Sequence, residues 1–240
     1  MENPPPPPSP PQEDEFRITK WQWLALQVYF FFNNLVCRTL DLALLLRHPR
    51  LLRAYFGVWA AELVRSPYKW PRSFEAKRQV QATGQTVREL MYGELPIFTG
   101  VWLFWRAGLG KDSQLIDLGA GRGRALLAAR WLGAKARGIE LLPGHVNITA
   151  GIINKTGAEL IQGDALDAPL DDATHIFVNW TGLSDATRTR LTERFVKLRP
   201  GTRVIVTSRP VEEARFQLTS HHLLLFTWGL ATAYVQELSE

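Results

Sequence analysis

The fold is decided by residues 114–124, QLIDLGAGRGR, which have the pattern of a buried strand that breaks into a glycine loop. Leu115 and Ile116 begin the apolar strand, and an apolar run at 125–129 then opens a helix. The loop contains Gly119, Gly121 and Gly123, which let the backbone turn sharply and approach a ligand with no Cβ in the way. A strand, a glycine turn and a helix N-terminus in this order are typical of a nucleotide-binding unit.

The residue before the glycines narrows the kind of ligand. Asp117 places a carboxylate at the carboxyl end of the strand, directly before the turn. This carboxylate would repel a pyrophosphate, whereas it would hold a ligand that carries an ammonium group. Asp117 therefore favours S-adenosylmethionine (SAM), a nucleoside that carries a cationic amino acid, over NAD or FAD.

Three later strands also end in polar residues. Glu140 lies 23 residues after Asp117, where an acid can accept hydrogen bonds from both ribose hydroxyls. Asp164 can accept a hydrogen bond from the adenine amino group, and Asn179 ends the next strand. Because ligands of open α/β sheets bind at the carboxyl ends of the strands, these side chains predict one site at one edge of the sheet.

Strands and helices alternate over the rest of the chain. The expected strands lie at 114–118, 136–140, 158–162, 174–179 and 202–208, and the expected helices at 122–133, 143–155 and 184–198. Two further strands, at 222–227 and 231–237, are joined by a turn at Trp228 and Gly229 and predict an antiparallel hairpin. The pattern predicts a doubly wound α/β fold with a mostly parallel, seven-stranded Rossmann-like sheet, preceded by an N-terminal helical extension.

These motifs resemble a known family. DLGAGRG at 117–123, then Glu140, Gly163-Asp164 and IFVN at 176–179 resemble a class I, seven-β-strand, SAM-dependent methyltransferase over residues 86–238. The C-terminal hairpin separates such a sheet from a plain dinucleotide-binding fold. MYGE at 91–94, and IFVNW followed by ERFVKLRPGTRVIVTSRP, resemble the non-SET histone-lysine methyltransferases. They also resemble the membrane-associated lysine methyltransferases of the ATP-synthase c-subunit type.

The resemblance implies roles for particular residues. It places Tyr92 and Glu94 in a loop over the cofactor, and Asn179 near the target lysine as the catalytic residue. The implied cofactor-binding set is Asp117, Gly119, Ala120, Gly121, Glu140, Asp164, Ala165, Tyr92 and Glu94. One departure is that Ala165 stands where the nucleosomal enzymes have an aromatic residue, so the adenine must stack on another side chain.

We therefore expect a SAM-dependent methyltransferase that acts on a protein lysine. Methyl transfer from a sulfonium needs a free lone pair in line with the methyl–sulfur bond and little acid–base help. The lysine must first lose its proton, which an apolar channel favours by lowering the pKa of the amine. Two alternatives stay open, a small-molecule or lipid methyltransferase and a non-catalytic SAM-fold module that serves as an interaction partner.

The chain before residue 86 has a different composition. Residues 1–15 predict a disordered, proline-rich tail, residues 16–66 a hydrophobic to amphipathic helical segment, and residues 67–85 a basic linker and helix. The methyltransferase-like domain occupies residues 86–240.

The helical segment predicts association with a membrane. Residues 21–37 carry no charge, are rich in aromatic side chains, and lie at the lower length limit for a membrane-spanning helix. Residues 40–64 have the amphipathic pattern of a helix that lies in a membrane interface. We expect an intracellular protein held on a membrane through residues 16–64, with its catalytic domain on the cytoplasmic side. Two helices packed on the domain or on another subunit would give the same pattern.

Composition excludes several kinds of site. The only cysteine is Cys37, so no internal disulfide and no cysteine-rich zinc site can form. The histidines show no metal-ligand spacing, and we expect no metal. Much of the +5 net charge precedes the catalytic region, which suits an anionic lipid or another acidic surface as well as a solvated helix face. We do not expect a nucleic-acid substrate, and the sequence does not indicate an oligomeric state.

Five side chains near these motifs receive structural interpretations. Arg122 and Arg124 are expected to face solvent at the start of a helix, and His222, like its neighbour His221, to be a structural strand residue. Trp180 fits either the core or a wall of the substrate channel.

Overall fold

The computed structural model describes residues 19–65 and 93–240, without the side chains of residues 62–65. The predicted tail at 1–15, the basic linker and helix at 67–85, and Tyr92 lie outside the described residues. The predicted domain boundaries in these segments therefore remain predictions.

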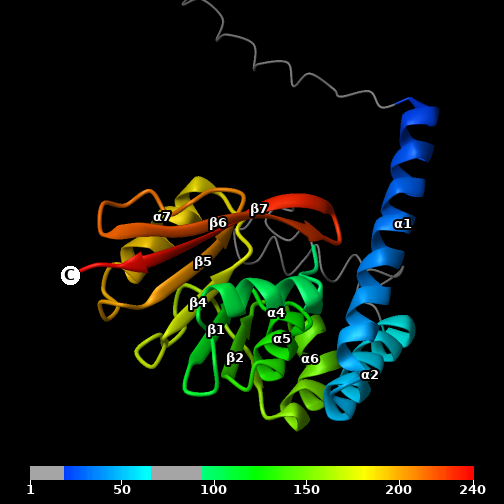
Figure 1. The fold of residues 1–240 in the computed structure, drawn as a ribbon, viewed down its shortest axis with the longest axis horizontal. Coiled ribbons are helices and arrows are strands. Elements are labelled where there is room, and N and C mark those ends of the chain that lie inside the picture. The colour runs from blue at the N-terminus through cyan, green and yellow to red at the C-terminus, as the bar shows by residue number, and fades with distance from the viewer. Residues whose placement is uncertain (1–18, 66–92) are drawn as a thin grey trace, which may run out of the picture.

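A single seven-stranded sheet forms the centre of the described chain (Figure 1). Its strands run in the order β3-β2-β1-β4-β5-β7-β6. The first five strands pair in parallel, and β7 pairs antiparallel with both β5 and β6. The strands are β1 (Gln114–Leu118), β2 (Lys135–Glu140), β3 (Glu159–Gln162), β4 (His175–Val178), β5 (Arg203–Thr207), β6 (Phe216–Phe226) and β7 (Gly229–Leu238). The predicted fold class is confirmed, including the C-terminal hairpin.

Helices cover both faces of this sheet (Figure 1). One buried apolar cluster joins the sheet to α4 (Ile97–Arg106), α5 (Arg124–Trp131) and α6 (Pro143–Ile153), and a second cluster joins it to α7 (Asp185–Phe195). A short 3-10 helix, η2 (Asn154–Thr156), follows α6. The central strands β1 and β4 are buried on both faces, which explains why their sequences are mostly apolar and do not alternate between apolar and polar residues.

Two elements differ from the expectation. The helix α4 was not identified from the sequence, because the outward-facing Trp102 and Trp105 are apolar and mask the buried face that contains Ile97, Val101 and Phe104. The strand β6 begins at Phe216 instead of residue 222. Its first residues are mostly exposed, so alternating burial gives no signal, and only pairing with β7 across a register shift at Leu218/Ser220 defines them.

The N-terminal segment forms two helices, α1 (Lys20–Leu45) and α2 (Pro49–Arg65). The side chain of Thr19 caps α1 by accepting a hydrogen bond from the Gln22 amide. The second helix begins at Pro49, a residue that is favoured in the first turn of a helix. The buried residues of α1 all lie in its C-terminal half, where they occur at every fourth position along one face of the helix. They are Asn33, Cys37, Asp41 and Leu45. The N-terminal half extends beyond the body of the domain (Figure 1).

Polar contacts hold α1 against the turn of the β6–β7 hairpin. Asn33 Nδ2 donates to the carbonyl oxygens of Phe226 and Thr227, at 2.8 and 3.0 Å. Thr227 in turn bonds the backbone of Glu94, because the Glu94 amide donates to its Oγ1 at 2.9 Å. The docking point of α1 is therefore only two hydrogen bonds away from the segment that carries Glu94.

Candidate active site

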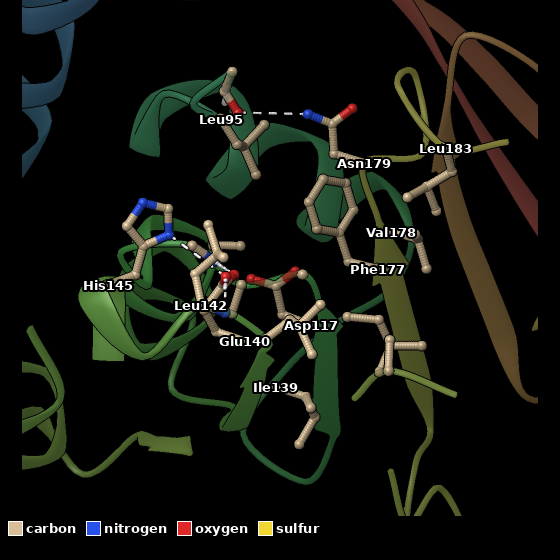
Figure 2. Close-up of a pocket in the computed structure, with 18 of the residues that line it drawn as sticks. Leu95, Asp117, Ile139, Glu140, Leu142, His145, Phe177, Val178, Asn179 and Leu183 are labelled. Carbon is tan, nitrogen blue, oxygen red and sulfur yellow. Dashed lines mark hydrogen bonds and ion pairs between the residues drawn. The ribbon is translucent and has the colours of Figure 1, made fainter. Parts of the chain in front are cut away.

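The cavity that collects the predicted residues lies between the carboxyl ends of β1 and β4 (Figure 2). The chain crosses from β1 toward β2 and β3 on one side, and from β4 toward β5 on the other, so this is the switch point of the sheet. Its lining includes most of the predicted set: Glu94, Asp117, Gly119, Ala120, Gly121, Glu140, Asp164, Ala165 and Asn179. The fold brings these residues together from separate segments of the chain.

The glycine loop after β1 is shaped by positive φ angles. Gly119 and Gly121 have φ values of 82° and 54°, a region that residues with a Cβ rarely adopt. The amides of Gly119 and Ala120 both donate to the carbonyl of Ile139, which draws the loop onto β2. A Cβ on Gly138 would lie 2.6 Å from the Cβ of Ala120, so glycine is also required in β2 for this close approach.

Asp117 is a buried carboxylate that faces another acid. It is 3% exposed, and no hydrogen bond to its side chain occurs within residues 19–65 and 93–240. Burial, together with the charge of Glu140, raises the pKa of Asp117 from 3.8 to about 8. Figure 2 shows the two carboxylates pointing toward one another. A ligand cation placed here would relieve both the burial and the repulsion, which fits the ammonium group of SAM.

Glu140 is held by backbone donors. Its Oε2 accepts from the Gly121 amide at 2.7 Å and its Oε1 from the Leu142 amide at 2.9 Å. His145, on the first turn of α6, places Nδ1 3.5 Å from Oε1 of the same carboxylate. The fixed carboxylate can accept from the hydroxyls of a ribose. Sequence analysis missed His145, although it lies five residues after Glu140, close enough to return to it on the following helix.

Asp164 lies just after the carboxyl end of β3, and one of its two carboxylate oxygens is bonded to the backbone. Its Oδ1 accepts from the Leu166 amide at 2.8 Å and so caps the following turn. Within residues 19–65 and 93–240, no hydrogen bond to the protein occupies Oδ2, which is available to an adenine amino group. The adjoining walls are apolar, because Leu142 and Leu166 line the same cavity. These leucines are the side chains on which an adenine can pack in place of the missing aromatic residue.

Asn179 is fixed by hydroxyl groups from two strand ends. Its Oδ1 accepts from Thr207 Oγ1 at 2.7 Å and from Thr181 Oγ1 at 2.9 Å, while Nδ2 points to the Gly93 carbonyl at 3.5 Å (Figure 2). Ser208, which also bonds Thr181, has a positive φ of 71°. The orientation of the Asn179 amide is therefore set before a substrate binds, because its oxygen already accepts two hydrogen bonds from the protein.

The two arginines after the glycine loop correct a prediction. Arg124 is 5% exposed and lines the cavity, with its Nε 2.8 Å from Glu94 Oε2, and Arg122 Nη1 lies 3.1 Å from Glu94 Oε1. The expectation that both face solvent is wrong, because Glu94 and the N-terminal helices cover this helix start. Burial opposes ionisation of Glu94, but Arg124 and Arg122 hold its pKa below its usual range.

Trp180 belongs to the core. It is 2% exposed and packs in the cluster beneath α7, and its indole Nε1 donates to the Arg209 carbonyl at 2.9 Å. The structure thus decides between the two open interpretations of this residue. His222 lies in β6 as predicted, with its ring 4.8 Å from that of Trp102. Among the described residues, no group of acids, histidines and cysteines is arranged to hold a metal ion.

No protein-family model matches the sequence, and no curated protein does. Solved structures do resemble it. An RNA methyltransferase from Salinibacter ruber, in complex with S-adenosyl-L-homocysteine, is 25% identical with a TM-score of 0.52 and covers 61% of this chain and 94% of its own. A putative RNA methyltransferase from Pyrococcus horikoshii has a TM-score of 0.52 at 15% identity and covers 68% of this chain and 98% of its own.

The sheet order, the hairpin and the cavity define the class of protein. The chain has the fold of the class I SAM-dependent methyltransferases. These two neighbours are an RNA methyltransferase and a putative RNA methyltransferase, so the resemblance to lysine methyltransferases rests on the sequence motifs alone.

Proposed function

We propose that this protein is a SAM-dependent methyltransferase that methylates the side chain of a protein lysine at a membrane surface. The observation that best supports SAM as the cofactor is the position of Asp117. It is a buried carboxylate that lies beside a glycine loop with positive φ angles and opposite Glu140. Such a pair is costly in an empty cavity and fits a nucleoside that bears a cation. The neighbour from Salinibacter ruber, which was solved with S-adenosyl-L-homocysteine, supports the same cofactor.

The chain's own residues have defined tasks in this proposal. SAM supplies an electrophilic methyl group, so the protein needs to bind, orient and exclude water rather than provide a strong base. Glu140 holds the ribose, Asp164 the adenine, and Asp117 the ammonium group. At the end marked by Asn179, the Gly93 carbonyl can accept an N–H of the acceptor amine, and Asn179 holds that carbonyl in place through Nδ2.

The choice of lysine depends on the resemblance of MYGE and IFVNW to lysine methyltransferases. A small amine or a lipid headgroup presents the same nucleophile and remains the alternative. The named activity of the Salinibacter neighbour makes RNA a further acceptor to be tested, although the sequence does not favour it. A non-catalytic module is disfavoured by the retention of Asp117, Glu140 and Asp164 around one cavity.

An acceptor assay tests this proposal. Incubation with methyl-labelled SAM, host membranes and host RNA should place label in protein, and acid hydrolysis should release it as methyl-lysine. We expect Asn179→Ala to lower turnover roughly 10- to 100-fold while S-adenosylhomocysteine (SAH) still binds, because the substitution loosens the acceptor end only. The matched control is Asn154→Ala, whose side chain bonds the Leu160 amide away from the cavity. Label in lipid or RNA alone would reject the lysine acceptor.

The membrane part of the proposal rests on α1. Among the described residues, α1 is the one helix long and apolar enough to cross a membrane by length and composition, with a mean hydropathy of 1.3. The part of α1 before its first buried residue, residues 20–32, extends only about 20 Å at 1.5 Å per residue, less than the roughly 30 Å of a bilayer core. While the other half stays docked, α1 cannot span. We propose that it lies in the plane of the interface.

Exposed side chains support this orientation. Trp21 is 80% exposed, and the outer face of the docked half also carries exposed apolar residues, among them Leu35 and Leu40. Two exposed arginines of α2, Arg50 and Arg53, are followed by exposed Phe56 and Trp59. Apolar side chains flanked by arginines suit the boundary between acyl chains and anionic headgroups. The intracellular location and the cytoplasmic side are part of this proposal.

Vesicle flotation tests the membrane mode. We expect the protein to float with phosphatidylglycerol-containing vesicles, and more weakly with phosphatidylcholine alone. Replacing Trp23 and Phe31 with serine should weaken binding at least about tenfold, since each buries a large apolar side chain in the bilayer. Leu218→Ser, on an exposed residue of β6, is the control and should change little. Resistance to alkaline carbonate extraction would contradict an in-plane helix and indicate a span.

A further inference from the structure

A chain of buried charges links α1 to the glycine loop. Asp41, on α1, is 2% exposed, and its Oδ1 accepts from the Phe98 amide at 2.9 Å, at the start of α4. Its Oδ2 lies 4.0 Å from Arg124 Nη1. Arg124 contacts Glu94 through Nε at 2.8 Å, and its guanidinium lies 5.0 Å from the centre of the Tyr55 ring of α2. Three N-terminal or loop elements thus converge on the first residue of α5.

Two of these charged residues line the cavity. Both Arg124 and Glu94 form part of its wall, whereas Asp41 does not touch it. Glu94 follows Gly93, whose carbonyl faces Asn179, so the pair lies beside the acceptor end of the cavity. With adenine and ribose assigned to Asp164 and Glu140, the amino-acid part of the cofactor would extend from the ribose toward this pair. That part carries one carboxylate and one ammonium, which need a cation and an anion in fixed positions.

A buried guanidinium needs fixed anions around it. Glu94 is shared between Arg124 and Arg122, so this one carboxylate faces two guanidinium groups. Among the described residues, Asp41 adds a carboxylate near Arg124 Nη1, and its own position is set by the Phe98 amide. The contacts at Nε and Nη1 therefore limit the rotation of Arg124 before a ligand enters.

We propose that Asp41 is a positioning residue for the amino-acid end of the cofactor site, acting through Arg124 and Glu94. This inference rests on the proposed function, because it takes SAM as the ligand. In this proposal α1 has two roles. It supports the cofactor site through Asp41, and it faces the membrane. The N-terminal extension would then be required for cofactor binding even when no membrane is present.

Two ligands that differ only in the amino-acid part test this. SAH has it, and 5′-methylthioadenosine lacks it while keeping the adenosine that Glu140 and Asp164 would hold. In calorimetric titrations of the full chain, Asp41→Asn should weaken SAH roughly tenfold and leave 5′-methylthioadenosine within about twofold of wild type. The asparagine keeps an oxygen for the Phe98 amide, so α4 retains its contact with α1.

A packing control separates charge from docking. Leu45→Ala removes a fully buried side chain from the same stripe of α1 without altering the charges. It should lower the thermal stability yet leave the ratio of the two affinities unchanged. Equal losses for both ligands in Asp41→Asn, or no loss for either, would overturn the positioning role. If wild type binds neither ligand, the cofactor proposal itself falls, and this inference with it.

Discussion

Replacing Asp117 with asparagine is expected to abolish measurable binding of SAM and, at the same time, to raise the thermal stability of the ligand-free protein. The ammonium group of SAM would lose its buried counter-charge, and a loss of this kind weakens binding by about 100-fold or more. Stability moves the other way, because the asparagine removes a buried acid that is repelled by Glu140. A merely structural role for Asp117 would make both quantities fall together.

Calorimetry with SAM and a thermal melt of the same samples measure both effects. The matched control is Asp112→Asn, an exposed aspartate just before the amino end of β1, which should change neither quantity. Undiminished SAM binding in Asp117→Asn would contradict the assignment of the ammonium subsite. Absence of binding in a well-folded wild type would move the non-catalytic interaction module to first place.

The second large effect is a dependence of SAM binding on pH. Burial and Glu140 raise the pKa of Asp117 to about 8 in the empty site, so the carboxyl is mostly protonated at pH 6. Binding the ammonium group requires the ionised form, and the affinity should rise about tenfold for each pH unit between 6 and 7. The rise should level off near pH 8, where both Asp117 and the α-amino group of SAM titrate.

Proton release distinguishes this origin from others. Titrations at pH 7 in buffers of different ionisation enthalpy should report close to one proton released per SAM bound. In Asp117→Asn the release should vanish, and 5′-methylthioadenosine, which has no ammonium group, should show little dependence on pH with either protein. A flat SAM profile from pH 6 to 8 would show that Asp117 is already ionised in the empty site.

The same shift affects the free protein. A raised pKa in the folded state means that the contribution of Asp117 to stability is fully present below pH 3.8 and is lost as the pH rises toward about 8. The ligand-free protein should therefore become less stable across this window through Asp117, and SAM should stabilise it most near pH 8. Asp117→Asn should flatten that part of the stability profile.

The sequence by itself determined the catalytic half of the molecule. Its signals are local: apolar runs that form strands, glycines that permit a turn, and a polar residue where each strand ends. Because parallel strands place their carboxyl ends at one edge, the side chains of Asp117, Glu140, Asp164 and Asn179 could be assigned to one site without coordinates. The hairpin pattern at the C-terminus then distinguished this sheet from other dinucleotide-binding folds.

Only the tertiary structure decided what depends on partners far away in the chain. Arg124 has the sequence context of an exposed helix start, but Asp41 and Glu94 bury it, and Asp41 lies 83 residues before it. The Asn179 amide is oriented by Thr207, and half of α1 is docked while the other half is exposed. No local pattern encodes these choices, since burial and charge pairing are properties of the surface that another segment brings. The sequence therefore shows which groups are present, and the fold shows which of them are held in place.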